Sequence, residues 1–464
     1  MKRRDMLKLT PLSLAGMAGM AHRGFTEEVD GMPVTGIPGK LSEQYQKKAL
    51  GMLTWIKENQ SENLLEASHL MARTILNGGT NWASWDQGHS TSYDTPPDRP
   101  GLPAVLTQGY NTKNAKKGDL LLINRGDVPA DAEKKNITVV AAPAPWGSDA
   151  KLSELIVREG AMQRIRPKAD IWIETQVTTL GAVMHIPGMP SPTGPISGIL
   201  GQVTMWMMVA DACRILARNG KSVPVSGDEP KLAADAPRVG LYDPLMDHYF
   251  AQVTREMEMI WAEMGSVRKI AKMAVDSVLA GGKMYGYSWF RPGLSAEAQT
   301  RRGGLTLSRG ATIVKGSVTD YSGAALKGGP NDLVIMGLTK PNDPTDLAAL
   351  DQFKRMNMKT ASIGPMTREI KVPGGRAVPK ETDVHVGRMC DTYGLYAVPG
   401  FDRKVCPTSG PLQLQIWWIT CMEIADEIIR RTNGNVPGAF LSGAIKGGSE
   451  NGRIMDSWWK ERGY

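Results

Sequence analysis

The sequence predicts an α/β protein with two tandem domains, each a parallel β-sheet wrapped by helices. A long apolar helix occurs twice, within residues 191–220 and again within residues 406–434. Each copy begins with Pro-Thr and Gly-Pro and ends at Asn-Gly. Short apolar runs that are typical of buried parallel strands precede both helices in the same order. Strands that alternate with helices favour parallel sheets covered by helices.

The two long helices share one pattern of apolar residues. In each copy these residues lie alternately four and three positions apart, and each member of the second set follows its counterpart by 215 positions (414 − 199). This spacing directs one side of each helix into a core, and the shared register indicates an internal duplication. The two sets are Ile199, Val203, Trp206, Ala210 and Cys213, and Leu414, Trp418, Cys421, Ala425 and Ile428.

Both helices also carry residues that are typical of helix ends. Pro195 and Pro411 suit the first turn, where a missing N–H group costs nothing. Gly220 and Gly434 suit the left-handed residue that follows the last turn. The two helices carry a larger number of bulky side chains than one apolar stripe needs. The additional side chains would fill either the interface between the two halves or a contact between subunits of a homo-oligomer. They are Trp206, Met207, Met208, Trp417 and Trp418.

Length and composition indicate a folded protein with more than one domain. The 464 residues are too many for one core, and 41% are hydrophobic and 22% charged. The formal net charge is +8, which suits an anionic ligand but is equally ordinary for a solvated surface. Because no dense basic stripe is interleaved with aromatic residues, nucleic-acid binding is not expected.

Residues 1–21 resemble a twin-arginine export signal. Arg3 and Arg4 precede a weakly apolar run, residues 9–21, that is too short to span a bilayer. Met6 stands where that pattern usually has Phe. The resemblance implies a periplasmic or secreted protein without an integral membrane span. The alternative is the basic N-terminus of a cytoplasmic protein.

The chain divides into two comparable halves. We expect a linker at residues 22–40, a first domain at 41–230, a connector at 231–242, a second domain at 243–450 and a C-terminal tail at 451–464. In the first half the pattern predicts helices at 41–59 and 64–77, the second capped by Ser61, and strands at 80–85, 120–123, 137–142, 170–173 and 182–187. In the second half it predicts a helix at 267–279, capped by Ser266, and strands at 283–289, 333–336 and 360–363. Residues 291–329, Gly-rich and basic, match nothing in the first half and are interpreted as an enlarged loop on the active face or a flexible insertion.

Four landmarks recur in the same order in both halves. They are Gly-Gly before the first strand, Asp before the second, an Ala-Asp or Thr-Asp strand, and the Pro-Thr turn into the long helix. In these landmarks the chain resembles a tandem of sugar isomerase (SIS) domains over nearly all of residues 41–450. The resemblance implies a phosphosugar-binding fold. The landmarks are Gly78-Gly79, Gly118-Asp119, Ala169-Asp170 and residues 192–195 in the first half, and Gly281-Gly282, Asp332, Thr382-Asp383 and residues 407–411 in the second.

Hydroxyl side chains at the ends of the strands and the starts of the long helices are candidate ligand-binding residues. The strands of a parallel sheet end, and the following helices begin, at the same edge of the sheet. There the free N–H groups and the positive end of a helix dipole attract an anion. Each hydroxyl can alternatively be a helix cap or a turn residue. The candidates are Ser84, Ser90, Thr91, Ser191 and Thr193 in the first half, and Ser288, Thr339, Thr408 and Ser409 in the second.

The loop after the second strand departs from the SIS pattern. Phosphosugar-binding members usually carry a Ser-x-Ser-Gly-x-Thr type loop there, whereas residues 123–127 read Ile-Asn-Arg-Gly-Asp. Arg125 can bind an anion through its charge, or it can be a solvated loop residue. A neutral sugar or a sugar acid is therefore an alternative to a sugar phosphate.

Aldose–ketose isomerisation needs a base and an acid, and three residues suit these roles. Asp86 and His89 lie three apart in one loop, and His185 precedes the Pro-Gly turn before the long helix. Alternatively, His89 only makes hydrogen bonds within its loop and His185 is an ordinary residue at the end of a strand. The three residues could also bind a metal, but their spacing matches no known metal motif. No nucleotide-binding or zinc motif occurs, so no cofactor is expected. The resulting hypothesis is an exported sugar-binding protein and candidate sugar isomerase. The alternative is a non-catalytic carbohydrate-binding or assembly protein.

Overall fold

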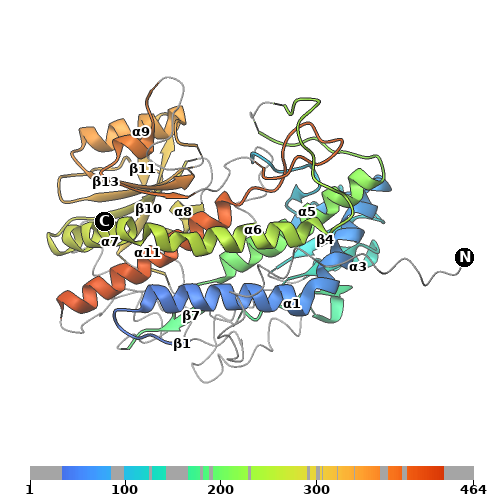
Figure 1. Cartoon of the computed structure of the whole chain (residues 1–464), viewed down its shortest axis with the longest axis horizontal. Helices are drawn as coiled ribbons and strands as arrows, with labels where there is room; N and C mark the ends of the chain where they lie inside the picture. The colour runs from blue at the N-terminus through green and yellow to red at the C-terminus, as the bar shows by residue number, and fades with distance from the viewer. Residues whose placement is uncertain are drawn as a thin grey trace, which may run out of the picture.

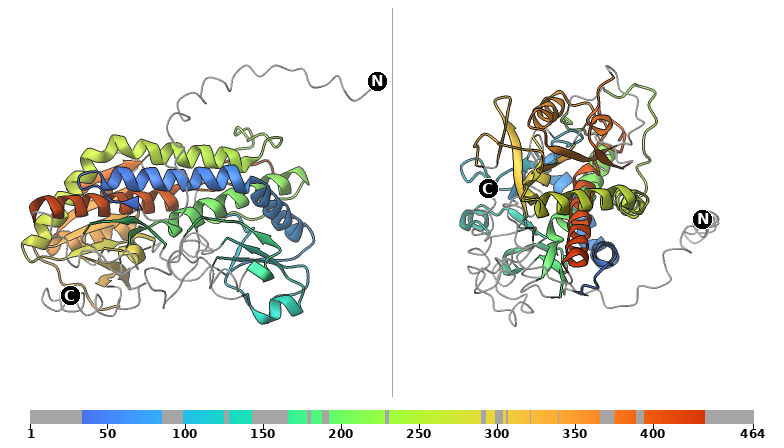
Figure 2. Two further views of the ribbon diagram at one scale, coloured as in Figure 1. Left: turned by 90° about the horizontal axis from the view of Figure 1, so that it is seen from below. Right: turned by 90° about the vertical axis from the view of Figure 1, so that its left-hand side faces the viewer.

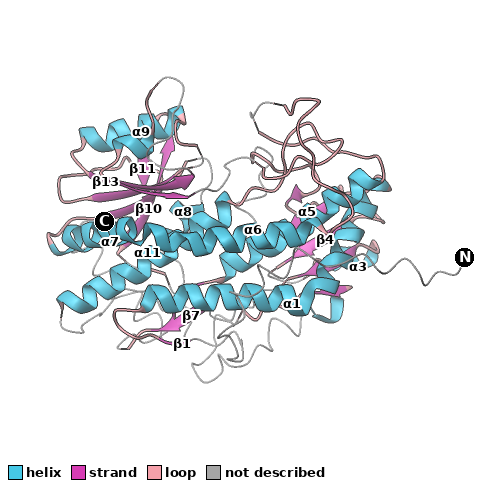
Figure 3. Cartoon of the chain, in the orientation of Figure 1, coloured by secondary structure: helices cyan, strands magenta, loops and turns pink. Residues whose placement is uncertain are grey.

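The computed structural model describes residues 34–84, 99–124, 128–142, 166–177, 181–187, 192–227, 231–289, 293–298, 304–305, 307–320, 322–338, 340–365, 375–388 and 394–432. The predicted export signal, the C-terminal tail and Gly434 lie outside these residues. Figures 1 and 3 show sheets at two ends of the molecule, joined by a layer of long helices.

The first sheet has five parallel strands in the order β3-β2-β4-β5-β6. The second has six in the order β11-β10-β9-β12-β13-β14, and only its β10–β11 pair is antiparallel. Without β11, the second order repeats the first strand for strand, which confirms the predicted class of tandem parallel sheets. The strands are β2 (Asn81–Ser84), β3 (Thr107–Gln108), β4 (Leu120–Ile123), β5 (Thr138–Ala141), β6 (Ile171–Trp172), β9 (Met284–Tyr287), β10 (Ser308–Val314), β11 (Ser317–Asp320), β12 (Leu333–Gly337), β13 (Lys359–Pro365) and β14 (Val384–Arg388).

A shared layer of helices covers the inner faces of both sheets (Figures 1 and 2). It consists of α1 (Leu41–Leu76), α5 (Ser197–Arg218), α6 (Leu245–Met259), the short η3 (Ile260–Glu263), α7 (Met264–Leu279) and α11 (Ser409–Arg431). The outer face of the first sheet packs against α3 (Ala130–Lys134), and that of the second against α9 (Pro344–Arg355). The other helices within the described residues are η2 (Arg166–Lys168), α8 (Gly293–Ala298) and α10 (Val378–Glu381). Because one apolar cluster includes residues of both halves, the halves share a core.

The apolar stripes of the two long helices lie where the pattern predicted. The five residues of α5 are fully buried, as are four of the five on α11, and Ile428 is partly buried. Trp206, Trp417 and Trp418 are at most 1% exposed. These side chains therefore fill the interior of one chain, and the alternative that they contact another subunit is wrong.

Several predicted element boundaries are wrong. The two helices expected at 41–59 and 64–77 form the single helix α1, because no Gly or Pro interrupts residues 52–76 and the Ser61 hydroxyl donates to the Lys57 carbonyl within the helix. Similarly, α7 continues from α6 through η3, so Ser266 begins no helix. Pro195 ends a strand, and α5 begins after it at Ser197. Gly220 has the predicted left-handed backbone, with φ +66°.

The strand predicted at 182–187 is not part of the first sheet. It is β7 (Ala182–His185), which pairs with β1 (Val34–Thr35) and β8 (Thr193–Pro195) in a separate three-stranded sheet. The hairpin partner β8 leads directly into α5, which holds this sheet beside the helical layer and apart from β6. Val34 and Thr35, predicted as linker, thus form a strand.

The described part of residues 291–329 forms α8, the long strand β10 and the hairpin strand β11. The segment therefore extends the edge of the second sheet, where the first sheet has only the two-residue β3. The interpretation as an enlarged loop or flexible insertion is wrong for this part, because residues 308–314 pair with β9 on one side and β11 on the other.

Candidate functional site

The Asp landmarks join neighbouring strands at the amino edges of the sheets. Asp119 accepts hydrogen bonds from the N–H groups of Thr80, at 2.9 Å, and Lys116, at 3.0 Å. Asp332 accepts from the N–H groups of Lys283, at 2.7 Å, and Gly329, at 2.9 Å. Both carboxylates thus fix the start of the preceding strand in the same way. These landmarks are structural equivalents, and they lie at the edge opposite the predicted ligand site.

The other two landmark pairs also match. Asp170 accepts from the Val139 N–H group at 2.7 Å, and Asp383 accepts from the Thr360 N–H group at 2.8 Å. A Cβ atom on Gly282 would lie 2.1 Å from the Asn331 carbonyl oxygen, and one on Gly79 would lie 2.7 Å from the corresponding oxygen of Gly118. The two Gly-Gly pairs are therefore needed for the close approach of the loop before the next strand.

At the carboxyl edge of the second sheet, α8 and α11 meet the end of β12. The Gln413 side chain in α11 donates to the Leu338 carbonyl at 3.0 Å. A Cβ atom on Gly337 would lie 2.9 Å from Gln413 Oε1 and 3.0 Å from the Leu294 side chain in α8. The start of α11 therefore lies over the carboxyl ends of the strands, as the predicted ligand site requires.

A buried arginine from the first half reaches the start of α11. The Arg99 guanidinium is 1% exposed, and its Nη2 donates to Ser409 Oγ at 2.8 Å. The preceding Thr408 hydroxyl donates to the buried Glu256 carboxylate of α6 at 2.6 Å. The helix start thus lies between a cationic and an anionic side chain.

The structure gives three other predicted residues structural contacts. Ser288 Oγ accepts from the Ser295 N–H group at 3.1 Å and lies 2.9 Å from Ser295 Oγ, so it supports the first turns of α8. Thr193 is fully buried in β8, where its hydroxyl donates to the Met184 carbonyl at 3.4 Å. His185 lies at the end of β7, in the three-stranded sheet, and its carbonyl accepts from the Gly36 N–H group at 2.8 Å. Ser84 ends β2 and is half-buried.

Seven predicted site residues lie outside the described residues and stay predictions. They are Asp86, His89, Ser90, Thr91, Arg125, Ser191 and Thr339. Sequence reasoning missed Arg99, Glu256 and Gln413. The Pro-Pro-Asp-Arg-Pro-Gly run around Arg99 has no periodicity that would indicate burial.

Two pockets lie away from the predicted site, at the amino edges of the sheets. One, of about 370 Å³, is lined by the starts of β5 and β6 and by residues around α3. The other, of about 160 Å³, lies beside β9, β10 and β11. Neither is lined by a predicted site residue. Among the described residues, α5 is long and apolar enough to cross a membrane, and its most apolar window is completely buried inside the protein.

The matching strand orders and the matching Asp and Gly-Gly contacts define an α/β protein with two duplicated parallel sheets. No protein-family model matches the chain. A UPF0309 protein of Streptomyces griseus is 23% identical over 220 residues, covering 40% of this chain and 87% of the relative.

Three solved structures show a weak likeness to the chain. The C-terminal domain of glucosamine-fructose-6-phosphate aminotransferase from Francisella tularensis is 12% identical with a TM-score of 0.39, covering 81% of this chain and 96% of that one. A proposed sugar binding protein from Salmonella typhimurium is 9% identical with a TM-score of 0.43, covering 83% and 98%. A proposed phosphosugar isomerase from Clostridium difficile is 10% identical with a TM-score of 0.43, covering 85% and 94%.

Proposed function

We propose that the chain is an SIS-type protein that binds an acidic sugar derivative at the carboxyl edge of the second sheet. The observation that supports this most is the Arg99–Ser409 contact at the start of α11. A helix start and a guanidinium both favour an anion. The Thr408 side chain caps none of the N–H groups of the first turn, because its hydroxyl is directed to Glu256.

The finer proposal is aldose–ketose isomerisation with Asp86, His89 and His185 as acid and base groups. A base removes a proton from the carbon beside the carbonyl, and an acid transfers a proton to the oxygen. The alternative is a carbohydrate-binding protein without catalysis.

A thermal-shift screen of sugars, sugar acids and sugar phosphates on the full chain tests the binding proposal. We expect acidic sugars to raise the melting temperature and neutral sugars to have a smaller effect. Ser409→Ala should reduce the shift, and Ser222→Ala, at an exposed position, should not. Equal shifts for wild type and Ser409→Ala would place binding elsewhere.

Catalysis and export have separate tests. Asp86→Asn and His89→Gln should abolish turnover of a bound sugar while its thermal shift is kept, and unchanged turnover rules out the catalytic assignment.

For export, replacing Arg3 and Arg4 with lysine should retain the protein in the cytoplasm. Cell fractionation that finds wild type and variant in the same compartment would contradict a twin-arginine signal.

A further inference from the structure

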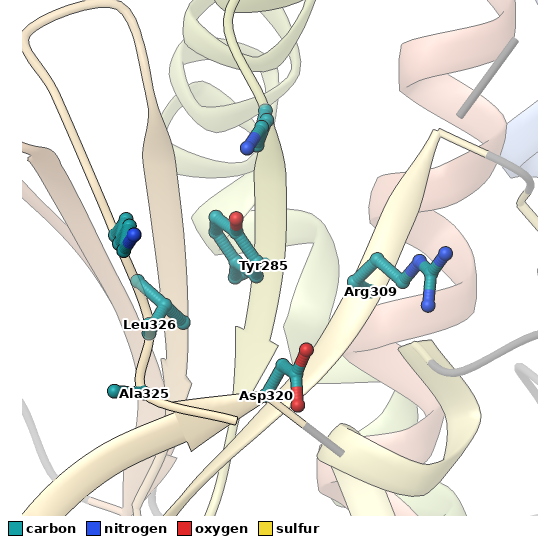
Figure 4. A pocket seen from close by; sticks show the side chains of 7 residues that line it. Tyr285, Arg309, Asp320, Ala325 and Leu326 are labelled. Carbon is teal, nitrogen blue, oxygen red and sulfur yellow. The ribbon is translucent and has the colours of Figure 1, made fainter. Parts of the chain in front are cut away.

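The pocket of about 370 Å³ lies at the amino edge of the first sheet, between the end of α3 and the start of β6. The residues that line it include three with charged side chains and three with aliphatic ones. They are Glu133, Lys168 and Asp170, and Val128, Ile137 and Val139. The pocket of the second half (Figure 4) lies beside β10 and β11, at the opposite end of the strand order from β13 and β14. The two pockets therefore belong to different parts of the duplicated fold.

One wall of the larger pocket has an equivalent in the second half. Glu133 lies in the last turn of α3, and its carbonyl accepts from the Asn136 N–H group at 3.0 Å. Lys354 lies in the last turn of α9, and its carbonyl accepts from the Asn357 N–H group at 2.9 Å. Both asparagines have a left-handed backbone, with φ +49° and +59°. The two helices therefore end in the same way before the next strand.

The facing wall is equivalent as well. Lys168 lies two positions before Asp170, which directly precedes β6. Glu381 lies two positions before Asp383, which directly precedes β14 and makes the matching hydrogen bond to the neighbouring strand. The first half therefore has a glutamate and a lysine where the second half has a lysine and a glutamate.

These two pairs of charges differ in whether they meet. Lys354 Nζ donates to Glu381 Oε2 at 3.3 Å, so the two walls are joined in the second half. Within the described residues, neither Glu133 nor Lys168 makes an ion pair, and both side chains are exposed and line the pocket. Two opposite charges therefore border one space in the first half without pairing with each other.

We propose that this pocket binds a small α-amino acid with an aliphatic side chain. The ammonium group of the ligand donates to the Glu133 carboxylate, and the carboxylate of the ligand accepts from the Lys168 ammonium group. A simple amine leaves Lys168 unpaired, and a simple anion leaves Glu133 unpaired and is repelled by Asp170. The aliphatic lining suits an apolar side chain, and the volume lies at the lower end of the range for small-molecule sites.

Calorimetric titration of the full chain with L-leucine tests the proposal. We expect one leucine molecule to bind per chain. Isopentylamine is leucine without its carboxylate, and isocaproate is leucine without its ammonium group. Each should bind about tenfold more weakly than leucine, as expected for the loss of one charge-assisted hydrogen bond. Both analogues keep the aliphatic chain, so the difference measures the charged groups alone.

Two variants assign the two charges of the ligand to the two walls. Lys168→Gln should weaken L-leucine by about tenfold and leave isopentylamine unchanged, because the amine has no carboxylate. Glu133→Gln should weaken L-leucine to a similar degree and leave isocaproate unchanged, because the acid has no ammonium group. Both residues are exposed, so both variants are expected to fold, and a circular dichroism melt checks this.

Matched controls separate this site from the rest of the molecule. Lys117→Gln and Glu66→Gln make the same charge changes at exposed positions of the first half that do not line the pocket, and both should bind L-leucine like wild type. Ser409→Ala should leave leucine binding unchanged even if it abolishes sugar binding. The proposal is overturned if L-leucine does not bind, if either analogue binds as tightly as leucine, or if Lys168→Gln or Glu133→Gln binds leucine like wild type.

Discussion

Asp211 of α5 and Asp426 of α11, 215 positions apart (426 − 211), each hold the start of a helix from the opposite half of the chain. Asp211 Oδ1 accepts from the Leu245 N–H group at the start of α6, at 2.8 Å. Asp426 Oδ2 accepts from the Leu41 N–H group at the start of α1, at 3.0 Å. Because the last helix of each half caps the first helix of the other, the two halves interlock.

We expect Asp211→Asn to destabilise the whole chain. Asp211 also accepts from Arg214 Nε at 2.7 Å and Nη2 at 2.8 Å, and the two side chains are 0% and 4% exposed. Loss of the carboxylate leaves a buried guanidinium without its counter-ion, at a cost of about 3–5 kcal/mol. Urea unfolding measures the change, and Asp235→Asn, at an exposed position, is the matched control. A difference below about 1 kcal/mol would contradict a buried ion pair here.

Asp119→Asn and Asp332→Asn should have similar effects in the two halves. An amide accepts through its oxygen only, so each variant leaves one of the backbone N–H groups bound by the carboxylate facing another donor, at a cost of about 1–3 kcal/mol. The two sites share no hydrogen-bond partner, so the costs should add in the double variant. Urea denaturation of the three variants measures this. Unequal decreases in the free energy of unfolding would show that the two equivalent carboxylates do not stabilise their halves equally.

The Arg99–Ser409 contact should stabilise the junction between the first half and α11. Ser409→Ala removes the acceptor of a buried charged donor, with an expected loss of about 1–3 kcal/mol. Ser222→Ala should change the free energy of unfolding by less than about 0.5 kcal/mol. Equal melting curves for the two variants would show that Arg99 needs no partner at Ser409.

The Glu297 carboxyl should make stability depend on pH. Burial in α8 raises its pKa from 4.5 to about 8, and a hydrogen bond with Trp418 opposes the shift in part. The folded state therefore keeps a proton that the unfolded chain releases, so the free energy of unfolding falls as pH rises from about 4.5 to about 8.

Glu297→Gln has no proton to lose and should escape this decline. The free energy of unfolding of this variant, relative to that of wild type, should rise by on the order of a few kcal/mol between pH 5 and pH 8. Urea unfolding at several pH values measures this, with Glu258→Gln, at an exposed position, as the control. Parallel pH profiles for wild type and Glu297→Gln would show that the buried carboxyl is not protonated.

Local patterns predicted much of the fold. The apolar stripes, the Gly-Gly pairs and the Asp landmarks are repeated in the sequence in the same order, so they can be recognised without knowing which residues they contact. For this reason the duplication and the parallel class could be predicted. The boundary at Ser61 was wrong because a serine inside a helix can satisfy its hydroxyl on the preceding turn, as it does at Lys57.

By itself, the sequence determined that an α/β unit occurs twice, since periodicity and turn residues act over a few positions. Only the tertiary structure decided how the copies combine. Asp211 and Asp426 look like ordinary helix acids in the sequence, and Arg99 looks like a loop residue. Their partners lie 34, 385 and 310 positions away, so contacts between distant elements, not local preference, determine their burial.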